Sequence, residues 1–294
     1  CSATRMGWTN ALQAESGRKP LEGVFFAVMS YPINVRGREV IRSTWLKQMT
    51  ELGAQYKFFI GGEGLVERFF EWESDTSDIV RLEGNWDHHD HQTFKTEATA
   101  HWVNKNVEDM RYLVKIEEDV LPVAKNLVKV IPGLPKRGLY AGHVLSNARP
   151  GWGKWKLEDE FLWALDENGL YPDYCKGSMY LLSPDAVAAL AEHHNPEAGE
   201  ENLFPFEDIN TAMVLQHIGI HPMGLMSNHS SGTKYLLSHD LYMDSPHDVV
   251  PSLCENNDYV AYHPVSPWIV QSAHAAESVH QFTCKYFDTD HSRF

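Results

Sequence analysis

Three consecutive acids, Glu117, Glu118 and Asp119, follow a short and mostly apolar run that starts at Tyr112. An isolated ionised carboxylate is costly to remove from water, so acids at the end of a buried strand must be paired or must bind a cation. Hard divalent ions such as Mg²⁺ and Mn²⁺ prefer oxygen ligands and often share them with substrate phosphates. The triplet therefore indicates a site for a metal ion and a diphosphate. The alternative is a solvated turn in which acids cluster.

A second acidic pair, Glu207 and Asp208, stands at the start of a predicted helix that runs from Phe206 to Gly219. Acids are favoured there because they cap the helix and interact with its dipole. The same position also suits a general base that takes a proton from a substrate hydroxyl. The residues alone leave both interpretations open.

Histidines offer a further set of candidate ligands. The HHDH run from His88 to His91 lies in a polar stretch without the paired spacing of a helical metal site, so a solvated loop is favoured. His263 follows a short apolar run and precedes Pro264. A lone histidine is more often structural, but this one is a candidate nitrogen ligand for the metal of the acidic triplet.

Three arginines, Arg36, Arg38 and Arg42, follow the first predicted strand and open the first predicted helix. Arginines in that position can hold a diphosphate, or they can pair with acids of the core. The chain contains neither GxGxxG nor GxxxxGK[ST], so it lacks the dinucleotide-binding and P-loop motifs.

The elements that must position these residues alternate early in the chain between apolar strands and helices of periodic spacing. Predicted strands cover residues 23–30, 56–61, 78–84, 112–120, 138–144, 178–183 and 220–225; predicted helices cover 36–52, 93–106 and 206–219, and another starts at Pro184. This alternation predicts an α/β fold around a largely parallel sheet. Ligands of such sheets bind at the carboxyl ends of the strands, where the acidic triplet lies.

The overall composition limits the classes of function. The 294 residues carry a formal net charge of −15, which argues against nucleic acid and anionic membranes as main partners. We see no linker or repeat, so a leader or stem over residues 1–20 and one domain over 21–294 are predicted. The four cysteines form no CxxC pair, and one N-x-S glycosylation sequon occurs at Asn228. Both features weakly favour a location in a secretory lumen.

Seven segments occur in an order that is more specific than any one of them: SYPINVRGREVIRSTW, YKFFIG, DIV with QTFKT, VKIEEDV, KWKL, YPDYCKGSMYLLS and FEDINTAMVLQHIGI. They resemble motifs of the β-1,3-glycosyltransferase family, which includes galactosyl-, N-acetylglucosaminyl- and Fringe-type enzymes of the GT31 type. Among these motifs are S-x-P-x-N, L-K-T-D-D-D-V-F, Y-P-P-Y-C-S-G-G-G-Y-V-L-S and E-D-V-Y-V-G. The resemblance spans roughly Gly23 to Ile220.

The resemblance implies a GT-A fold, with a Rossmann-like mixed sheet flanked by helices in a single domain. It implies inverting transfer of galactose or N-acetylglucosamine from a UDP-sugar to a hydroxyl of a glycan or glycoprotein acceptor. It also implies a catalytic domain in the Golgi lumen, which meets the membrane only through an N-terminal helix outside this chain. The resembling Y-P-x-Y-C segment contains Cys175, where the family tends to use a disulfide; its partner among Cys1, Cys254 and Cys284 stays open.

The resemblance also assigns roles to individual residues. Asp119 and His263 would bind Mn²⁺ or Mg²⁺, which neutralises charge on the leaving diphosphate, and Asp208 would be the general base. The remaining candidates would contact the UDP-sugar: Ser30, Arg38, Arg42, Lys95, Glu117 and Glu118. Of these, Glu117 and Glu118 would hold the ribose or would bind the metal ion through a water molecule.

The chain departs from the family pattern at several positions. The family's D-D-D is Glu117-Glu118-Asp119 here, its S-G-G-G is Lys176-Gly177-Ser178-Met179, and the stretch from Glu158 to Tyr171 is longer than usual. An inactive glycan- or nucleotide-binding relative is therefore the alternative function. A metal-dependent hydrolase is a more distant one, because no HExxH motif is present. Three tryptophans of the aromatic-rich loop in this part of the chain, Trp152, Trp155 and Trp163, either stack on sugar rings or belong to the core.

Overall fold

The computed structural model describes residues 17–62, 71–73, 75–83, 92–151, 155–195, 203–225, 260–263 and 271. Within these ranges no helix combines the length and the apolar character needed to cross a membrane. The division into a leader over 1–20 and a domain over 21–294 stays a prediction. The HHDH run, the sequon at Asn228, Trp152 and three of the four cysteines lie outside the described residues.

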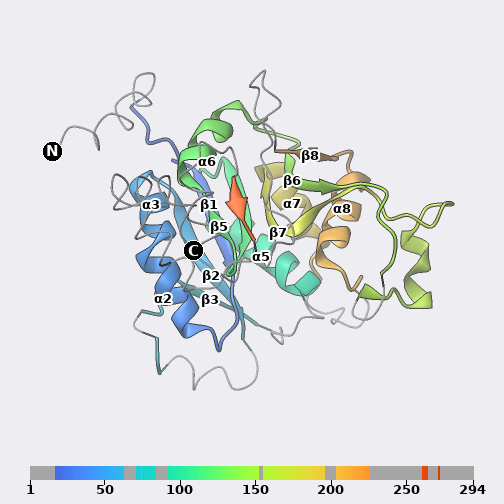
Figure 1. The fold of residues 1–294 in the computed structure, drawn as a ribbon, viewed down its shortest axis with the longest axis horizontal. Coiled ribbons are helices and arrows are strands. Elements are labelled where there is room, and N and C mark those ends of the chain that lie inside the picture. Colours follow the sequence, from blue (N-terminus) through green and yellow to red (C-terminus); the bar gives the residue numbers. More distant parts are fainter. Residues whose placement is uncertain are drawn as a thin grey trace, which may run out of the picture.

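Seven strands form the central mixed sheet in the order β3-β2-β1-β4-β7-β6-β8 (Figure 1). The strands in chain order are β1 (Val24–Met29), β2 (Gln55–Gly61), β3 (Ile79–Leu82), β4 (Tyr112–Glu117), β6 (Tyr140–Leu145), β7 (Tyr174–Leu182) and β8 (Pro222–Gly224). The neighbours β3-β2-β1-β4 run parallel, whereas β7 is antiparallel to both β4 and β6. The predicted mixed α/β sheet flanked by helices is confirmed.

Helices cover both faces of the sheet, and strand β1 shows why. Its residues alternate, with Phe26 packing in one apolar cluster and Phe25 in the other, as the period of two in a strand requires. One cluster contains helices α2 (Val35–Ser43), α3 (Trp45–Glu51) and α6 (Ala124–Val130); the other contains α5 (Gln92–Asn106), α7 (Pro184–His193) and α8 (Glu207–His217). Strands that are covered on both faces must be apolar throughout, which explains the continuous runs in the sequence.

Two elements differ from the sequence-based prediction. The helix predicted over 36–52 is broken at Thr44, whose backbone leaves the helical region and whose hydroxyl donates a hydrogen bond to the carbonyl of Val40 at 2.6 Å. Hydroxyls of this kind compete with the helical ladder and allow a break. Strand β7 begins at Tyr174 instead of Ser178, because Cys175 continues the pairing with Val144 of β6 beyond a register shift.

Three further short elements lie outside the central sheet. A 3-10 helix, η4 (Asp159–Ala164), lies in the long stretch that precedes β7. A separate two-stranded sheet pairs β5 (Leu121–Pro122) with β9 (Ala261–Tyr262), in antiparallel register. This pairing brings the segment after β9 back to the carboxyl end of β4.

Candidate active site

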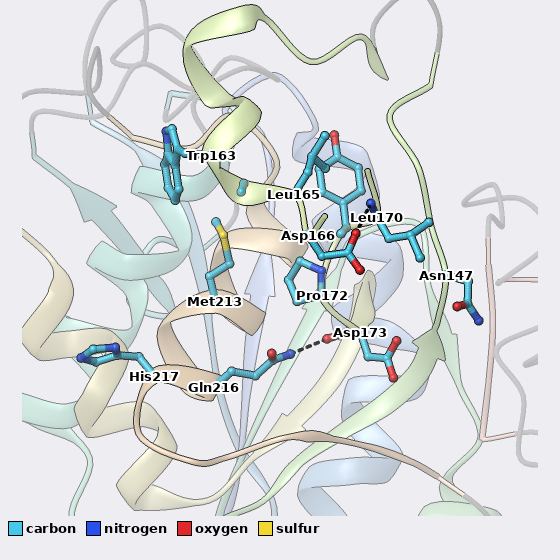
Figure 2. Close-up of a pocket in the computed structure, with 12 residues that line it drawn as sticks. Asn147, Trp163, Leu165, Asp166, Leu170, Pro172, Asp173, Met213, Gln216 and His217 are labelled. Carbon is cyan, nitrogen blue, oxygen red and sulfur yellow. Dashed lines mark hydrogen bonds between the residues drawn. The ribbon is translucent and has the colours of Figure 1, made fainter. Parts of the chain in front are cut away.

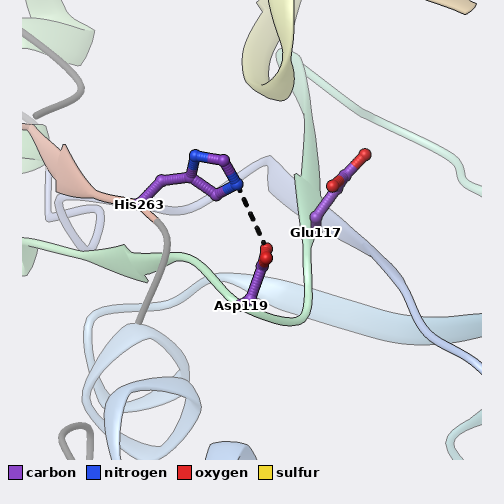
Figure 3. A group of neighbouring side chains, drawn as sticks. All are labelled: Glu117, Asp119 and His263. Atoms are coloured by element: carbon purple, nitrogen blue, oxygen red, sulfur yellow. Dashed lines mark ion pairs between the residues drawn. The ribbon is translucent and has the colours of Figure 1, made fainter. Parts of the chain in front are cut away.

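A possible metal-binding group lies where β4 ends. Ligand atoms of Glu117, Asp119 and His263 all lie within 4.8 Å of one another. Figure 3 shows Asp119 and His263 facing each other, with Glu117 beside them at the end of β4. The β5–β9 pair is the reason, because Asp119 precedes β5 by two residues and His263 follows β9 directly. The structure thus brings together the two predicted ligands and adds Glu117 to them.

The donor set suits the ion expected there. Two carboxylates and one imidazole are ligands that Mn²⁺ accepts, and the carboxylates also suit Mg²⁺. Oδ1 of Asp119 is buried, and within the described residues it has no hydrogen-bond donor; its nearest partner is Nε2 of His263 at 3.5 Å. A buried carboxylate oxygen without a donor is costly unless a cation compensates it. The residues present therefore fit a divalent metal ion.

Glu118 points to a different part of the site from its two neighbours. Its Oε2 accepts hydrogen bonds from the hydroxyl of Ser30 and, at 3.3 Å, from the backbone N–H of Tyr31. Burial raises the pKa of Glu118, and the Ser30 hydroxyl and the charge of Lys95 oppose this rise. The ammonium of Lys95 donates to the carbonyl of Ser30 at 2.6 Å and lies 4.9 Å from the centre of the Tyr31 ring. Three predicted donor-site residues thus form one network at the carboxyl end of β1.

The two predicted arginines, Arg38 and Arg42, have acidic partners within the chain. Arg38 is buried and pairs with Glu73, and it also donates to the Ser30 hydroxyl at 2.9 Å. Arg42 binds Glu73 at 2.9 Å and Asp78 at 2.8 Å. Pairing with core acids was one of the two readings of these arginines, and it is the arrangement that the structure contains. Their contact with a diphosphate stays a prediction.

Lys115 connects the metal group to the second acidic pair. Its ammonium lies 3.2 Å from Glu117 and 3.2 Å from Glu207, and it donates to the carbonyl of Gly177 at 2.5 Å. These two carboxylates raise the pKa of Lys115 against the opposing effect of its complete burial. Glu207 also accepts a hydrogen bond from the Tyr180 hydroxyl at 2.5 Å. The glutamate of the pair is therefore a structural partner of a buried cation.

Asp208, the other acid of the pair, has a strongly raised pKa. Burial raises its pKa from 3.8 to about 7, and the neighbouring charge of Glu207 adds to the rise. Lys115 and the N–H groups of Ile209 and Gly177, at 3.0 and 3.3 Å from its oxygens, limit this rise. A base is most effective when its pKa lies near the working pH.

Sequence reasoning missed the roles of Lys115, Gly177 and Tyr180. A lysine in the middle of the apolar run Tyr112–Ile116 was the available signal, because a buried ammonium must find acidic partners. Gly177 permits a close approach, since a Cβ there would lie 2.6 Å from Oε2 of Glu207, a side chain that Lys115 and Tyr180 hold in place. Cys175 is buried as a free thiol beside this network, and its three possible partners lie outside the described residues.

Comparison with known proteins gives consistent matches over most of the chain. The Galactosyltransferase family model matches residues 36–226. Human N-acetyllactosaminide beta-1,3-N-acetylglucosaminyltransferase 3 is 26% identical over 72% of this chain and 58% of its own length. Human acetylgalactosaminyl-O-glycosyl-glycoprotein beta-1,3-N-acetylglucosaminyltransferase is 28% identical over 74% of this chain and 58% of its own length. The chain thus spans a little over half the length of these curated relatives.

A solved structure is similar at lower identity. The crystal structure of a glycosyltransferase involved in the glycosylation of the major capsid of PBCV-1 matches 86% of this chain and 98% of its own, with a TM-score of 0.44 and 14% identity. The family assignment depends instead on the sequence matches, which cover well over half of the chain and contain the acidic triplet and the acidic pair at the start of α8. The chain belongs to the Galactosyltransferase family of β-1,3-glycosyltransferases.

Proposed function

We propose that the chain is the catalytic part of an inverting β-1,3-glycosyltransferase that uses a UDP-sugar and a divalent metal ion. One observation carries the proposal: the buried Lys115 lies 3.2 Å both from Glu117 of the possible metal group and from Glu207, whose neighbour Asp208 has a pKa of about 7. Transfer of a sugar to a hydroxyl needs both functions, a centre that accepts charge on the leaving diphosphate and a base for the attacking hydroxyl.

Each residue of the site has a defined task in this proposal. Glu117, Asp119 and His263 hold Mn²⁺ or Mg²⁺, which when bound supplies positive charge to the diphosphate of the UDP-sugar. Asp208 accepts the proton of the acceptor hydroxyl, and Lys115 holds the adjacent Glu207 in place through an ion pair at 3.2 Å. The nucleotide of the donor is expected at the carboxyl end of β1, beside the network of Ser30, Lys95 and Glu118. Two arginines that share Glu73 as a partner, Arg38 and Arg42, stabilise this end of the sheet.

N-acetylglucosamine is the favoured sugar within this proposal, and galactose is the alternative. Several similar curated proteins are named as N-acetylglucosaminyltransferases, among them a human protein named UDP-GlcNAc:betaGal beta-1,3-N-acetylglucosaminyltransferase 8. A glycan or glycoprotein acceptor and a location in the Golgi lumen belong to the same proposal, which follows from the family.

A panel of UDP-sugars, scored by UDP release with Mn²⁺ and with a chelator, tests the proposal. We expect metal-dependent release from one donor, greater in the presence of a β-galactoside acceptor, and loss of transfer but not of UDP binding in Asp208→Asn. Two observations support the alternative of an inactive relative. Glu118 accepts a hydrogen bond from Ser30, and the triplet Glu117-Glu118-Asp119 contains a single aspartate. No release from any donor, with or without metal, would reject the transferase in favour of that alternative.

A further inference from the structure

A pocket of about 630 Å³ lies between the long stretch before β7 and the helix that begins with the acidic pair. Its size is in the range of small-molecule sites. Figure 2 shows Trp163 and Met213 on one side of it and Leu170 and Asp173 on the other. Its wall is thus built partly from the segment Glu158–Tyr171.

Trp163 carries the main chemical signal of this pocket. Its side chain is 65% exposed, although one edge is fixed against the ring of Phe204 at a centroid distance of 6.0 Å. Trp163 is therefore not part of the apolar core, so the core interpretation from the sequence is wrong for this residue. An exposed indole beside apolar side chains and polar groups is the combination that binds the apolar face and the hydroxyls of a sugar.

The second signal is a pair of polar side chains in the pocket wall. Gln216 and the carboxylate of Asp173 both line the pocket, and the Gln216 side chain is fixed by a 2.8 Å hydrogen bond to the Asp173 carbonyl. A small number of polar groups held in place among apolar ones is typical of a site that orients a small ligand.

The position of the pocket relates it to the reaction. Met213 and Gln216 lie on α8, five and eight residues after Asp208, which is about 7 and 12 Å along the axis of a helix. A small apolar cluster that includes Tyr171, Phe204 and Ile209 ties the segment before β7 to the first turn of α8. The pocket is therefore held at a fixed distance from the base and lies beyond the reach of the attacking hydroxyl itself.

The charge of the lining selects among sugars. Asp166 and Asp173 line the pocket, and His217 is the one basic residue that lines it in the described part of the chain. The Asp166 carboxylate accepts the N–H groups of Asn168 and Leu170, both at 2.8 Å, so it stays in this wall, where the charge of the exposed Arg149 also acts on it. The lining itself thus holds two carboxylates and one histidine, and the carboxylates would repel a sulfate or carboxylate on the ligand.

We propose that this pocket is a subsite for a neutral sugar unit of the acceptor glycan, next to the unit that receives the transferred sugar. The inference depends on the proposed transferase function and names which part of the acceptor the chain selects: a neutral oligosaccharide, with Trp163 stacking on one of its inner units. An acceptor that lacks this unit is used less well.

Acceptor kinetics with Trp163→Ala test the subsite. The probes are the N-acetyllactosamine disaccharide, a neutral tetrasaccharide of two such units, and that tetrasaccharide with a sulfate on its inner N-acetylglucosamine. A central tryptophan contact often carries much of the binding free energy, so we expect the KM for the neutral tetrasaccharide to rise about tenfold, which corresponds to about 1.4 kcal/mol. The KM values for the disaccharide and the UDP-sugar should stay unchanged.

Two exposed residues outside the pocket serve as matched controls. Trp72→Ala removes an indole that is 63% exposed, and Leu162→Ala changes η4 itself at a side chain that is 50% exposed. Both variants should keep the wild-type preference for the tetrasaccharide. Asp173→Lys is the reverse test, because the new cation should favour the sulfated tetrasaccharide over the neutral one. Unchanged melting temperatures confirm that each variant is folded.

Binding without a donor separates this inference from the proposed function. Saturation-transfer NMR should show contact between the wild-type chain and the inner sugar unit of the neutral tetrasaccharide, and Trp163→Ala should lose it. Equal KM ratios in wild type and Trp163→Ala, or equal binding of the sulfated glycan by wild type, would overturn the subsite while the transferase stands. Absence of transfer from any donor would overturn the transferase, and the NMR experiment would still decide the pocket.

Discussion

Asp208 should set the dependence of sugar transfer on pH. Its carboxyl must be ionised to accept a proton, and its pKa is raised from 3.8 to about 7, first by burial and then by the charge of Glu207. A carboxyl with a pKa of about 7 is about one-tenth ionised at pH 6 and about nine-tenths ionised at pH 8. The value of kcat/KM should therefore rise about tenfold per pH unit below pH 6 and level off above pH 8.

The same shift has a cost in folding, and its sign follows from linkage. Three pKa units correspond to about 4 kcal/mol in favour of the protonated carboxyl in the folded chain. This contribution to the free energy of unfolding is present below about pH 4 and is lost as the pH rises through about 7. The site thus sacrifices stability at neutral pH to hold a base of useful strength.

Glu207→Gln is the perturbation that tests this account. The amide can place its oxygen on Lys115 and its NH₂ group on the Tyr180 hydroxyl, so the contacts survive while the negative charge beside Asp208 is removed. The pKa of Asp208 should fall, and the acid limb of kcat/KM should move to lower pH. The measurement is a pH profile of UDP-sugar transfer between pH 4 and 9.

Two controls make the pH result decisive. Saturating Mn²⁺ at every pH removes the contribution of protons that compete for the metal ligands. Asp208→Asn should lower the rate by about 10²- to 10⁴-fold, the usual contribution of a general base, and should lose the limb altogether. A wild-type limb near pH 4, or an identical limb in Glu207→Gln and wild type, would show that Asp208 is not the titrating base.

Three further predictions concern the surrounding network. Lys115→Met leaves Glu207 buried without its cation, so the free energy of unfolding should fall by about 3–5 kcal/mol in chemical denaturation, and full stability would contradict the ion pair. Asp119→Asn should weaken Mn²⁺ binding at least about tenfold in calorimetry, whereas Asp75→Asn, an exposed acid outside the metal group, should leave the affinity unchanged. Gly177→Ala would place a Cβ 2.6 Å from Oε2 of Glu207, so it should reduce transfer in a chain with near-normal far-UV circular dichroism; wild-type turnover would mean that the approach is not critical.

The local pattern of the sequence was sufficient for the strands of the central sheet and for most of the helices that cover it. Runs such as Val24–Met29 are apolar at every position because the strand is covered on both faces, and this signal is independent of distant parts of the chain. The acidic triplet could be placed at the end of a strand, and the pair Glu207-Asp208 at the start of a helix, from the same local periodicity. The break at Thr44 escaped prediction because a hydroxyl bond to the preceding turn outweighed an otherwise helical pattern.

The chemistry of individual side chains was decided by contacts between distant segments. His263 reaches Asp119 only because β9 pairs with β5, and Lys115 meets Glu207 across 92 positions of the chain. Glu117 and Glu118 are neighbours of the same residue type, yet one faces the metal group and the other faces Ser30. Residue type and spacing therefore determined which groups could act. Long-range packing, through burial and opposite charge, decided their partners, their proton affinities and their direction.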